Sequence, residues 1–359
     1  MLNIHKKYLL KKFSKKIIKI TGIFFILVVI INLIEEANFL KESDNSFFTP
    51  IILTILNAPS LLNEMLPFIF LISGQFFFID IYENREIYTL RQFGLDNFTI
   101  LKFLTYTSFL FGILIIILFY NFSAILKNQY LQIKNEYTTD NKYLAVITKN
   151  GIWIKDASNE EILIINADKI ENEYLINTSI TRLNNNFQII ENIISEKINV
   201  NDFDWILLNS TVTDSKNDST VIKQKKFKTN FNLHRINNLF SDLSSLTYLE
   251  LLKLKKDYKT IGYSVDEIDI QAHKFYSMPF LLMLMTVISM IIMINNKFKN
   301  NLFLNILIGI FISVLIYYIS HFSSILGANG KIPIILSVWL PVIIIMIISA
   351  IGIIRLNEK

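Results

Sequence analysis

The stretch IIKITGIFFILVVIINLI, residues 17–34, decides the fold class of this chain. Only Lys19, Thr21 and Asn32 interrupt a run that is otherwise apolar apart from one glycine. At about 1.5 Å per residue a helix of this length spans about 27 Å, close to the roughly 30 Å hydrocarbon core of a bilayer. The stretch therefore predicts a helix that spans a membrane.

Comparable apolar runs recur along the chain. They cover residues 61–81, 100–126, 275–294, 302–322 and 332–354. One such run could be a buried helix of a soluble core, but six of them cannot all be. With 52% hydrophobic residues, the chain is only slightly more hydrophobic than an average globular protein. The clustering of these residues, not their overall share, therefore indicates a membrane protein. We predict a multi-pass α-helical membrane protein with six transmembrane helices.

The placement of charge predicts the orientation of these helices. Residues 1–16 carry six lysines and no acid, and residues 295–301 (NNKFKNN) are purely basic. Residues 35–50 are net acidic. Basic residues that flank membrane spans stay in the cytoplasm, so we expect both termini inside and residues 35–50 and 127–272 outside. Because the lysines lie beside spans, a nucleic-acid-binding surface is a poor alternative.

The first sixteen residues have a helical pattern of their own. Leu9, Phe13 and Ile17 recur every four residues with lysines between them. This pattern is typical of a helix that lies in the membrane interface. A lysine cluster that only fixes the topology is the alternative, and both stay open. The apolar run is too long for a cleaved signal peptide, so we expect a retained first helix.

A long polar insert, about residues 130–270, separates three spans from the next three. Short β-branched and aromatic runs alternate there with Asn, Asp, Gly and Ser at intervals near ten residues. This spacing predicts an all-β sandwich or barrel. The insert lacks proline, so its edge strands need a cover or a pairing partner. From Leu246 the pattern becomes helical, with Leu246, Leu249 and Leu252 expected on one face.

A polar island, ENREIYTLRQFGLDN at residues 83–97, lies between the second and third spans. Ile87, Leu90 and Gly94 fall on one face of a short helix, which predicts an apolar docking side. Such a helix is marginal in water without a partner. Glu86 near its start suits the helix dipole, and Arg91 can form forked hydrogen bonds with a carboxylate. The island is therefore a solvated loop or a handle for another protein.

No catalytic or metal-binding constellation is recognisable. The chain has no cysteine, no phosphate-binding loop and no nucleophile elbow, and its four histidines lack ligand spacing. We therefore predict no catalytic residues, no metal site and no enzyme activity. Carboxylates inside the predicted spans are few: Glu64 lies in the second span, and Asp80 lies at its inner end. A charge at that depth is costly unless it faces a cavity, a partner or the outer water layer.

Several motifs resemble the LptF/LptG permease family of lipopolysaccharide export, over nearly the full length. The family pattern E-x-x-x-x-R-x-x-G matches Glu86, Arg91 and Gly94. The other matching residues are Pro59 and Pro67 of the second span, Gly151 and Trp153 of GIWIKD, the strand WILL at 205–208, and Gly327, Gly330, Pro333, Trp339 and Pro341 near the end. The last group is most like LptG.

The resemblance implies a division into residues 1–127, 128–270 and 271–359, with an inserted periplasmic β-jellyroll-like domain. It also implies a bacterial inner-membrane location. The expected partners are a second permease (LptF type), a cytoplasmic ATPase dimer (LptB type), a single-span LptC-type protein, a periplasmic bridge protein (LptA type) and lipopolysaccharide. Residues 83–96 would be the helix that couples to the ATPase. This chain would bind no cofactor, because ATP is used by the partner subunit.

One departure concerns the outer end of the first span. LptG-type chains usually carry lysines there, thought to meet lipid A phosphates, but this chain reads NLIEEANFLKE. Asn32 stands where a lysine is expected, Glu35 follows, and only Lys41 is positive. Phosphate binding then falls to Lys41, to the partner permease or to divalent cations that bridge acid and phosphate. We take Lys41, Glu35 and Glu64 as substrate-binding candidates.

Two other functions fit parts of the sequence. A lipoprotein-release or efflux-type permease also carries a periplasmic domain, but usually has four spans. A membrane sensor with a periplasmic β ligand domain would need a cytoplasmic signalling domain, for which the predicted inner loops are too short.

Overall fold

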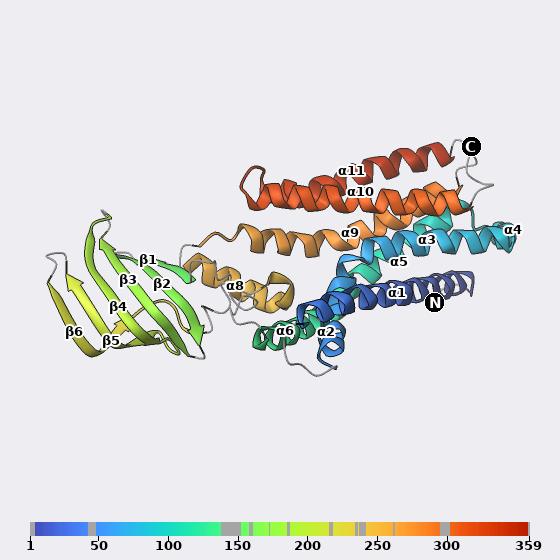
Figure 1. Cartoon of the computed structure of the whole chain (residues 1–359). Helices are drawn as coiled ribbons and strands as arrows, with labels where there is room; N and C mark the ends of the chain where they lie inside the picture. Colours follow the sequence, from blue (N-terminus) through green and yellow to red (C-terminus); the bar gives the residue numbers. More distant parts are fainter. Residues whose placement is uncertain are drawn as a thin grey trace. The chain divides into compact units, whose positions relative to one another are not determined.

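A computed structural model describes the chain over residues 4–41, 48–137, 152–157, 161–171, 173–184, 187–214, 218–233, 236, 242–260, 263–294 and 302–357. The chain divides into two compact units. A helical unit contains residues 1–127 and 266–359, and a second unit contains residues 128–265. The helices and strands are shown in Figure 1.

The helical unit is built from long apolar helices. They are α1 (Ile4–Phe39), α2 (Thr49–Glu64), α3 (Leu66–Glu83), α4 (Glu86–Gln92), α5 (Asn97–Leu114), the π-helical turn η1 (Ile115–Tyr120), α6 (Asn121–Glu136, which continues into the second unit), α9 (Asp266–Ile294), α10 (Leu302–Ala328) and α11 (Ile334–Asn357). Among the described residues six segments are long and apolar enough to cross a membrane: Ile4–Phe39, Leu66–Glu83, Asn97–Lys134, Asp266–Met293, Leu302–Ala328 and Ile334–Arg355. The six predicted spans are confirmed.

The second span begins differently from the prediction. It is preceded by a separate helix, α2, and the chain breaks at Met65 before Pro67 enters the first turn of α3. Proline has no N–H to donate and is favoured in a first turn, which explains why the new helix starts there.

The predicted interfacial helix is not a separate element. Residues 4–16 are the first turns of α1, continuous with the first span. Leu9 and Phe13 are fully buried, in one cluster with Phe77 of α3 and Leu90 of α4. The apolar face that was expected to meet lipid therefore packs on the helical unit itself.

The centre of the helical unit is formed by α3 and α9. In their most apolar windows 67% of the residues are buried, against 17% in α1. Hydroxyl and amide groups join the helices there: Ser108 and Thr286 lie 2.7 Å apart between α5 and α9, and Gln75 of α3 donates to the Asn305 carbonyl of α10 at 2.7 Å. Helices in lipid gain little from burying apolar groups, so small side chains and such hydrogen bonds join them.

The second unit contains one antiparallel sheet. Its strands are β1 (Ile152–Ala157), β2 (Glu161–Glu171), β3 (Tyr174–Asn184), β4 (Ile189–Asn199), β5 (Asp204–Asp214) and β6 (Ser219–Lys228), in that spatial order. The turn η2 (Leu243–Ser245) and the helix α8 (Tyr248–Thr260) follow. An inserted all-β domain in a six-span helical protein is the predicted fold class, which is confirmed.

The hydrophobic core of the second unit lies on one face of the sheet, to which every second residue of a strand contributes its side chain. β2, for example, buries Leu163, Ile165 and Ala167. The largest fully buried side chain is Trp205, whose indole N–H donates to the Phe231 carbonyl at 2.7 Å. This bond ties the segment after β6 to the core of the sheet.

The helix α8 confirms the helical pattern, but the three leucines expected on one face do not share one environment. Leu249 and Leu252 are exposed, whereas Leu251 and Leu254 are buried with Leu246. Leucines occur on both sides of this helix, so their spacing alone did not determine which side packs.

Candidate functional site

The polar island folds as predicted into a short helix, α4, that follows α3 closely. It begins after Arg85, which adopts a left-handed conformation at φ 58°. Glu86 lies in its first turn and Arg91 in its last. Both charges interact favourably with the helix dipole. The start of α1, the end of α11 and α4 lie at the same end of the helical unit (Figure 1).

Gly94 ends α4 in a Schellman motif. It adopts φ +78°, its N–H donates to the Arg91 carbonyl at 2.9 Å, and the Leu95 N–H donates to the Leu90 carbonyl at 3.0 Å. Glycine is the residue that takes this left-handed conformation without a steric penalty. The left-handed conformation at the end of α4 therefore explains why the E-x-x-x-x-R-x-x-G pattern has a glycine at position 94.

The two faces of α4 have opposite environments. Ile87 and Leu90 are buried against α1 and α3, so the apolar side predicted to dock a partner packs within the chain. The outward side carries Arg91 and Tyr88, which is 59% exposed. Phe93, directly after α4, meets His5 with its ring but is still 60% exposed. Sequence reasoning missed Tyr88 and Phe93, although two aromatic rings in a polar island were a visible signal.

Glu86 is held by α1. Its carboxylate accepts from the Lys12 ammonium at 2.6 Å and from the Tyr8 hydroxyl at 2.8 Å. Arg91 donates to the Asn97 side chain at 3.2 Å, at the start of α5. The two charged residues of the pattern thus reach different neighbouring helices.

Asp96 starts the next helix. Its side chain accepts from the Thr99 N–H at 3.0 Å as the N-cap of α5. Hydrogen bonds from Thr99 hold the pKa of the Asp96 carboxyl below its ordinary value, because they favour the ionised form. The segment from α4 to the start of α5 is therefore held at one end by the contacts of Glu86 and at the other by the Asp96 cap.

The three substrate-binding candidates lie on two helices and one loop. Glu35 is exposed on α1, whereas its neighbour Glu36 is fully buried. Lys41 is exposed just after α1. Glu64 is the last residue of α2, exposed beside the Met65 break, and its charge acts on Lys274 of α9.

A buried polar chain lies near Glu35 and was missed by the sequence reasoning. Lys127 of α6 donates to the Asn57 side chain at 2.8 Å, and Asn57 of α2 donates to Asn32 of α1 at 3.1 Å. Asn32 and Asn57 are both buried. Since they are far apart in sequence, only the packing of three helices brings them together.

The remaining motif residues shape helix ends and contacts. Gly330 at φ +67° ends α10 with the same hydrogen-bond pattern as Gly94, and a side chain at Gly327 would overlap Ser337 of α11. Trp339 donates to His273 of α9 at 3.4 Å. Pro333 precedes α11, Pro341 lies inside α11, and Trp153 is exposed on β1. Gly151 lies outside the described residues.

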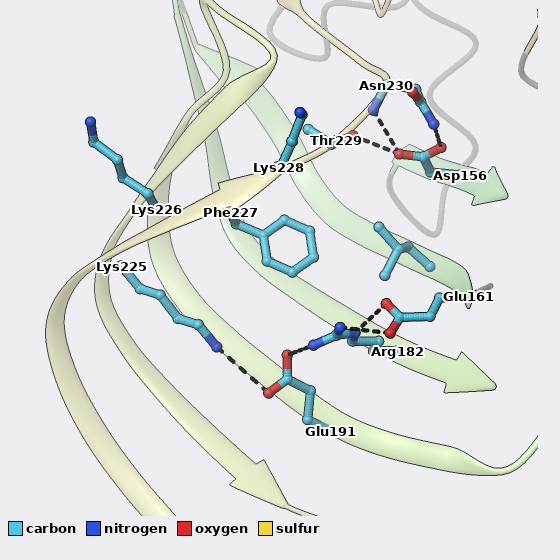
Figure 2. Close-up of a pocket in the computed structure, with 11 residues that line it drawn as sticks. Asp156, Glu161, Arg182, Glu191, Lys225, Lys226, Phe227, Lys228, Thr229 and Asn230 are labelled. Atoms are coloured by element: carbon cyan, nitrogen blue, oxygen red, sulfur yellow. Dashed lines mark hydrogen bonds and ion pairs between the residues drawn. The ribbon is translucent and has the colours of Figure 1, made fainter. Parts of the chain in front are cut away.

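The second unit has a charged pocket of about 470 Å³, lined by Asp156, Glu161, Leu163, Arg182, Glu191, Lys225, Lys226, Phe227, Lys228, Thr229 and Asn230 (Figure 2). Arg182 forms a forked pair with Glu161 at 2.5 and 2.7 Å and bonds Glu191 at 3.0 Å. Hydrogen bonding to Arg182 lowers the pKa of Glu161 below its ordinary 4.5. Glu161 and Glu191 of this pocket are therefore paired with a cation of the protein itself.

Asp156 closes one side of this pocket. Its carboxylate accepts from the Thr229 hydroxyl at 2.8 Å and from the Asn230 side chain at 2.8 Å. Because these residues follow β6, the contact brings the end of the last strand back to β1. Within the described part of the chain, no group of three or more His, Asp or Glu residues could hold a metal ion.

Comparison with known proteins gives one family. A family model described as lipopolysaccharide export system permease LptF/LptG matches residues 7–355, nearly the whole chain. No curated protein matches the chain significantly. The matched range begins in the first turn of α1, ends in the last turn of α11 and includes the other apolar helices, α4 and the sheet.

Proposed function

We propose that this chain, which belongs to the LptF/LptG family of lipopolysaccharide export permeases, is the LptG-type subunit of its transporter. Family membership and six apolar helices make it a multi-pass inner-membrane permease component of a transporter, not itself an enzyme. In the proposed role it takes lipopolysaccharide from the membrane and passes it to an LptA-type bridge. The match of Gly327, Gly330 and Trp339 to the LptG pattern favours LptG over LptF.

The proposed orientation places both termini in the cytoplasm and the sheet in the periplasm. Two features support it: the lysine-rich start of α1 and the basic residues 295–301, against the net acidic residues 35–50. The start of α1 and the end of α11 lie at one end of the helical unit together with α4 (Figure 1). With this orientation α4 faces the cytoplasm.

The single observation that carries the proposal is the two-sided packing of α4. Ile87 and Leu90 anchor it in the helical unit, while Tyr88, Arg91 and Phe93 face outward. Exposed aromatic and arginine residues are the types that dominate protein–protein contacts. We assign this outward side to the LptB-type ATPase dimer, whose ATP hydrolysis would drive transport.

The substrate-binding part of the proposal includes Lys41, Glu35 and Glu64 and adds Lys127. The Lys127 ammonium is linked through Asn57 of α2 to Asn32 of α1, which replaces the expected lysine. A cation there can attract the phosphates of lipopolysaccharide. An LptF-type permease and an LptC-type protein complete the proposed assembly.

Six spans disfavour the four-span lipoprotein-release and efflux permeases. The sensor alternative has no structural observation in its favour. Neither is pursued as a second candidate.

Affinity purification from gently solubilised membranes, followed by mass spectrometry, tests the proposal. We expect a second six-span permease, a soluble ATPase and lipid A. Y88A/F93A should lose the ATPase while it keeps the second permease, because it removes the outward aromatic side of α4. Phe122→Ala on α6 is the control, since this phenylalanine is similarly exposed elsewhere. Recovery of neither ATPase nor glycolipid with the native chain would contradict the proposal.

A further inference from the structure

A line of three donors on α1 faces α3 and α4. Tyr8, Lys12 and Lys16 are four residues apart and therefore share one side of the helix. The Lys16 ammonium pairs with Asp80 of α3 at 2.5 Å, and Lys12 pairs with Glu86 of α4 at 2.6 Å. Two consecutive turns of α1 thus bind two consecutive helices.

Apolar contacts accompany this line of polar contacts. Leu9 and Phe13 are fully buried in the same cluster as Ile87 and Leu90. One turn earlier, the His5 ring stacks on Phe93 with centroids 4.3 Å apart. The first turns of α1 therefore contact α4 at Glu86, pack in the same apolar cluster as Ile87 and Leu90, and meet Phe93 just after the end of α4.

The pair between Lys12 and Glu86 is shielded from water. The Lys12 side chain is 13% exposed and that of Glu86 26%. An ion pair with a second hydrogen bond, here from Tyr8, holds its geometry better than an exposed pair of flexible side chains. A helix of seven residues is not stable alone, so its position depends on such contacts.

We propose that Lys12 and Tyr8 are positioning residues that hold Glu86, and through it α4, on α1. α4 and the first membrane span then move as one body when a partner acts on the outward side of α4. Glu86 works inside the chain, whereas Tyr88, Arg91 and Phe93 meet the partner. The inference rests on the proposed coupling function of α4.

The rival role for Glu86 is a direct contact with a cation of the ATPase. Both roles predict a loss of transport when Glu86 is replaced, so a single substitution does not separate them. Exchanging the two charges does. If Lys12 is the true partner of Glu86, K12E/E86K restores the pair; if the partner is a cation of another protein, E86K stays defective whatever stands at position 12.

The test uses the full chain in its complex and measures lipopolysaccharide released per ATP hydrolysed. We expect K12E and E86K each to lower this ratio about tenfold, a mid-range coupling for contacting residues, and the double variant to recover most of it. K11E and K15E are matched controls, because Lys11 and Lys15 are exposed on α1 and give the same charge change next to the same span. We expect both to behave like the native chain.

A second readout needs no partner protein. The chain has no cysteine, so a spin label on Tyr88→Cys reports on α4 alone. In the isolated chain in detergent, the label should become mobile in K12E and in E86K and slow again in the double variant. If α4 did not couple to an ATPase, this mobility pattern would still be expected. The experiment therefore tests the contact between Glu86 and Lys12 independently of the proposed function.

Two results would overturn the inference. One is a double variant as defective as E86K, beside a fully active K12E. The other is label mobility that is identical in the native chain and in all three charge variants.

Discussion

The two units of the molecule distribute their apolar side chains in opposite ways. In the sheet, alternate residues such as Leu163 and Ile165 of β2 point inward and are buried. In the helical unit, α1 leaves Ile23, Ile26 and Ile30 exposed and buries Asn32. Burial therefore follows hydrophobicity along β2 but not along this stretch of α1.

The difference follows from the solvent of each unit. Water drives apolar groups into the core of the sheet, where burial contributes about 25 cal/mol per Å². Lipid tails are as apolar as leucine, so α1 can expose isoleucine, and its polar groups turn inward to find partners. An isoleucine is therefore buried on β2 but can be exposed on α1.

The largest expected effect is in the core of the sheet. Trp205→Ala should destabilise the second unit by about 3–5 kcal/mol, because it removes the largest buried side chain and its hydrogen bond. Hydrogen exchange of β5 in the full chain measures this loss. Trp153→Ala is the control, since Trp153 is exposed on β1; an equal loss there would mean that its outer face is also packed.

A matched pair of isoleucines tests the comparison directly. Ile26 of α1 is 60% exposed and Ile194 of β4 is 56% exposed. Ile26→Lys should disfavour membrane insertion by about 3 kcal/mol, because it places a charge near the middle of a span. Ile194→Lys should change stability by less than about 0.5 kcal/mol, since its surroundings are aqueous.

The fraction of chain inserted into membranes measures the first variant, and thermal unfolding of the second unit measures the other. Similar effects at the two positions would show that the units do not differ in solvent.

An effect smaller than those of Trp205→Ala and Ile26→Lys is expected in the charged pocket of the second unit. Arg182→Met should cost about 1–2 kcal/mol, less than a fully buried pair, because Arg182 and Glu161 are 33% and 31% exposed. Since Arg182 lowers the pKa of Glu161 below 4.5, its contribution is fully present above pH 4.5 and is lost as the pH falls through the lowered pKa.

Hydrogen exchange of β2 and β3 at pH 7 and at pH 3 checks this prediction. The native chain should lose protection on acidification, and the gap between it and Arg182→Met should narrow. A gap that widens at pH 3 would contradict the assigned role of the ion pair.

The elements themselves were largely predictable from the sequence. Run length gave the six spans, turn spacing gave the strands, and the polar island became α4 with Glu86 in its first turn. These features depend on local patterns, which one sequence contains. Pro67 was a visible signal for the end of one helix and the start of another at Met65, although α2 was not predicted as a separate helix.

The buried faces were not predictable. Ile87 and Leu90 pack inside the chain, against expectation, and Leu249 and Leu252 of α8 are exposed although Leu246 is buried. Which side of a short helix is buried depends on its neighbours in space, here α1 at a distance of about 75 residues in sequence. The Asn32–Asn57–Lys127 chain was hidden for the same reason, since three separate helices supply it.

Transport by the reconstituted complex tests the central claim most directly. The native chain, copurified with its partners, is placed in proteoliposomes loaded with lipopolysaccharide, and release to a soluble acceptor is measured with ATP and with a non-hydrolysable analogue. We expect release with ATP and none with the analogue. No release with ATP, from a complex that hydrolyses ATP and contains this chain, would contradict the assignment as a lipopolysaccharide export permease.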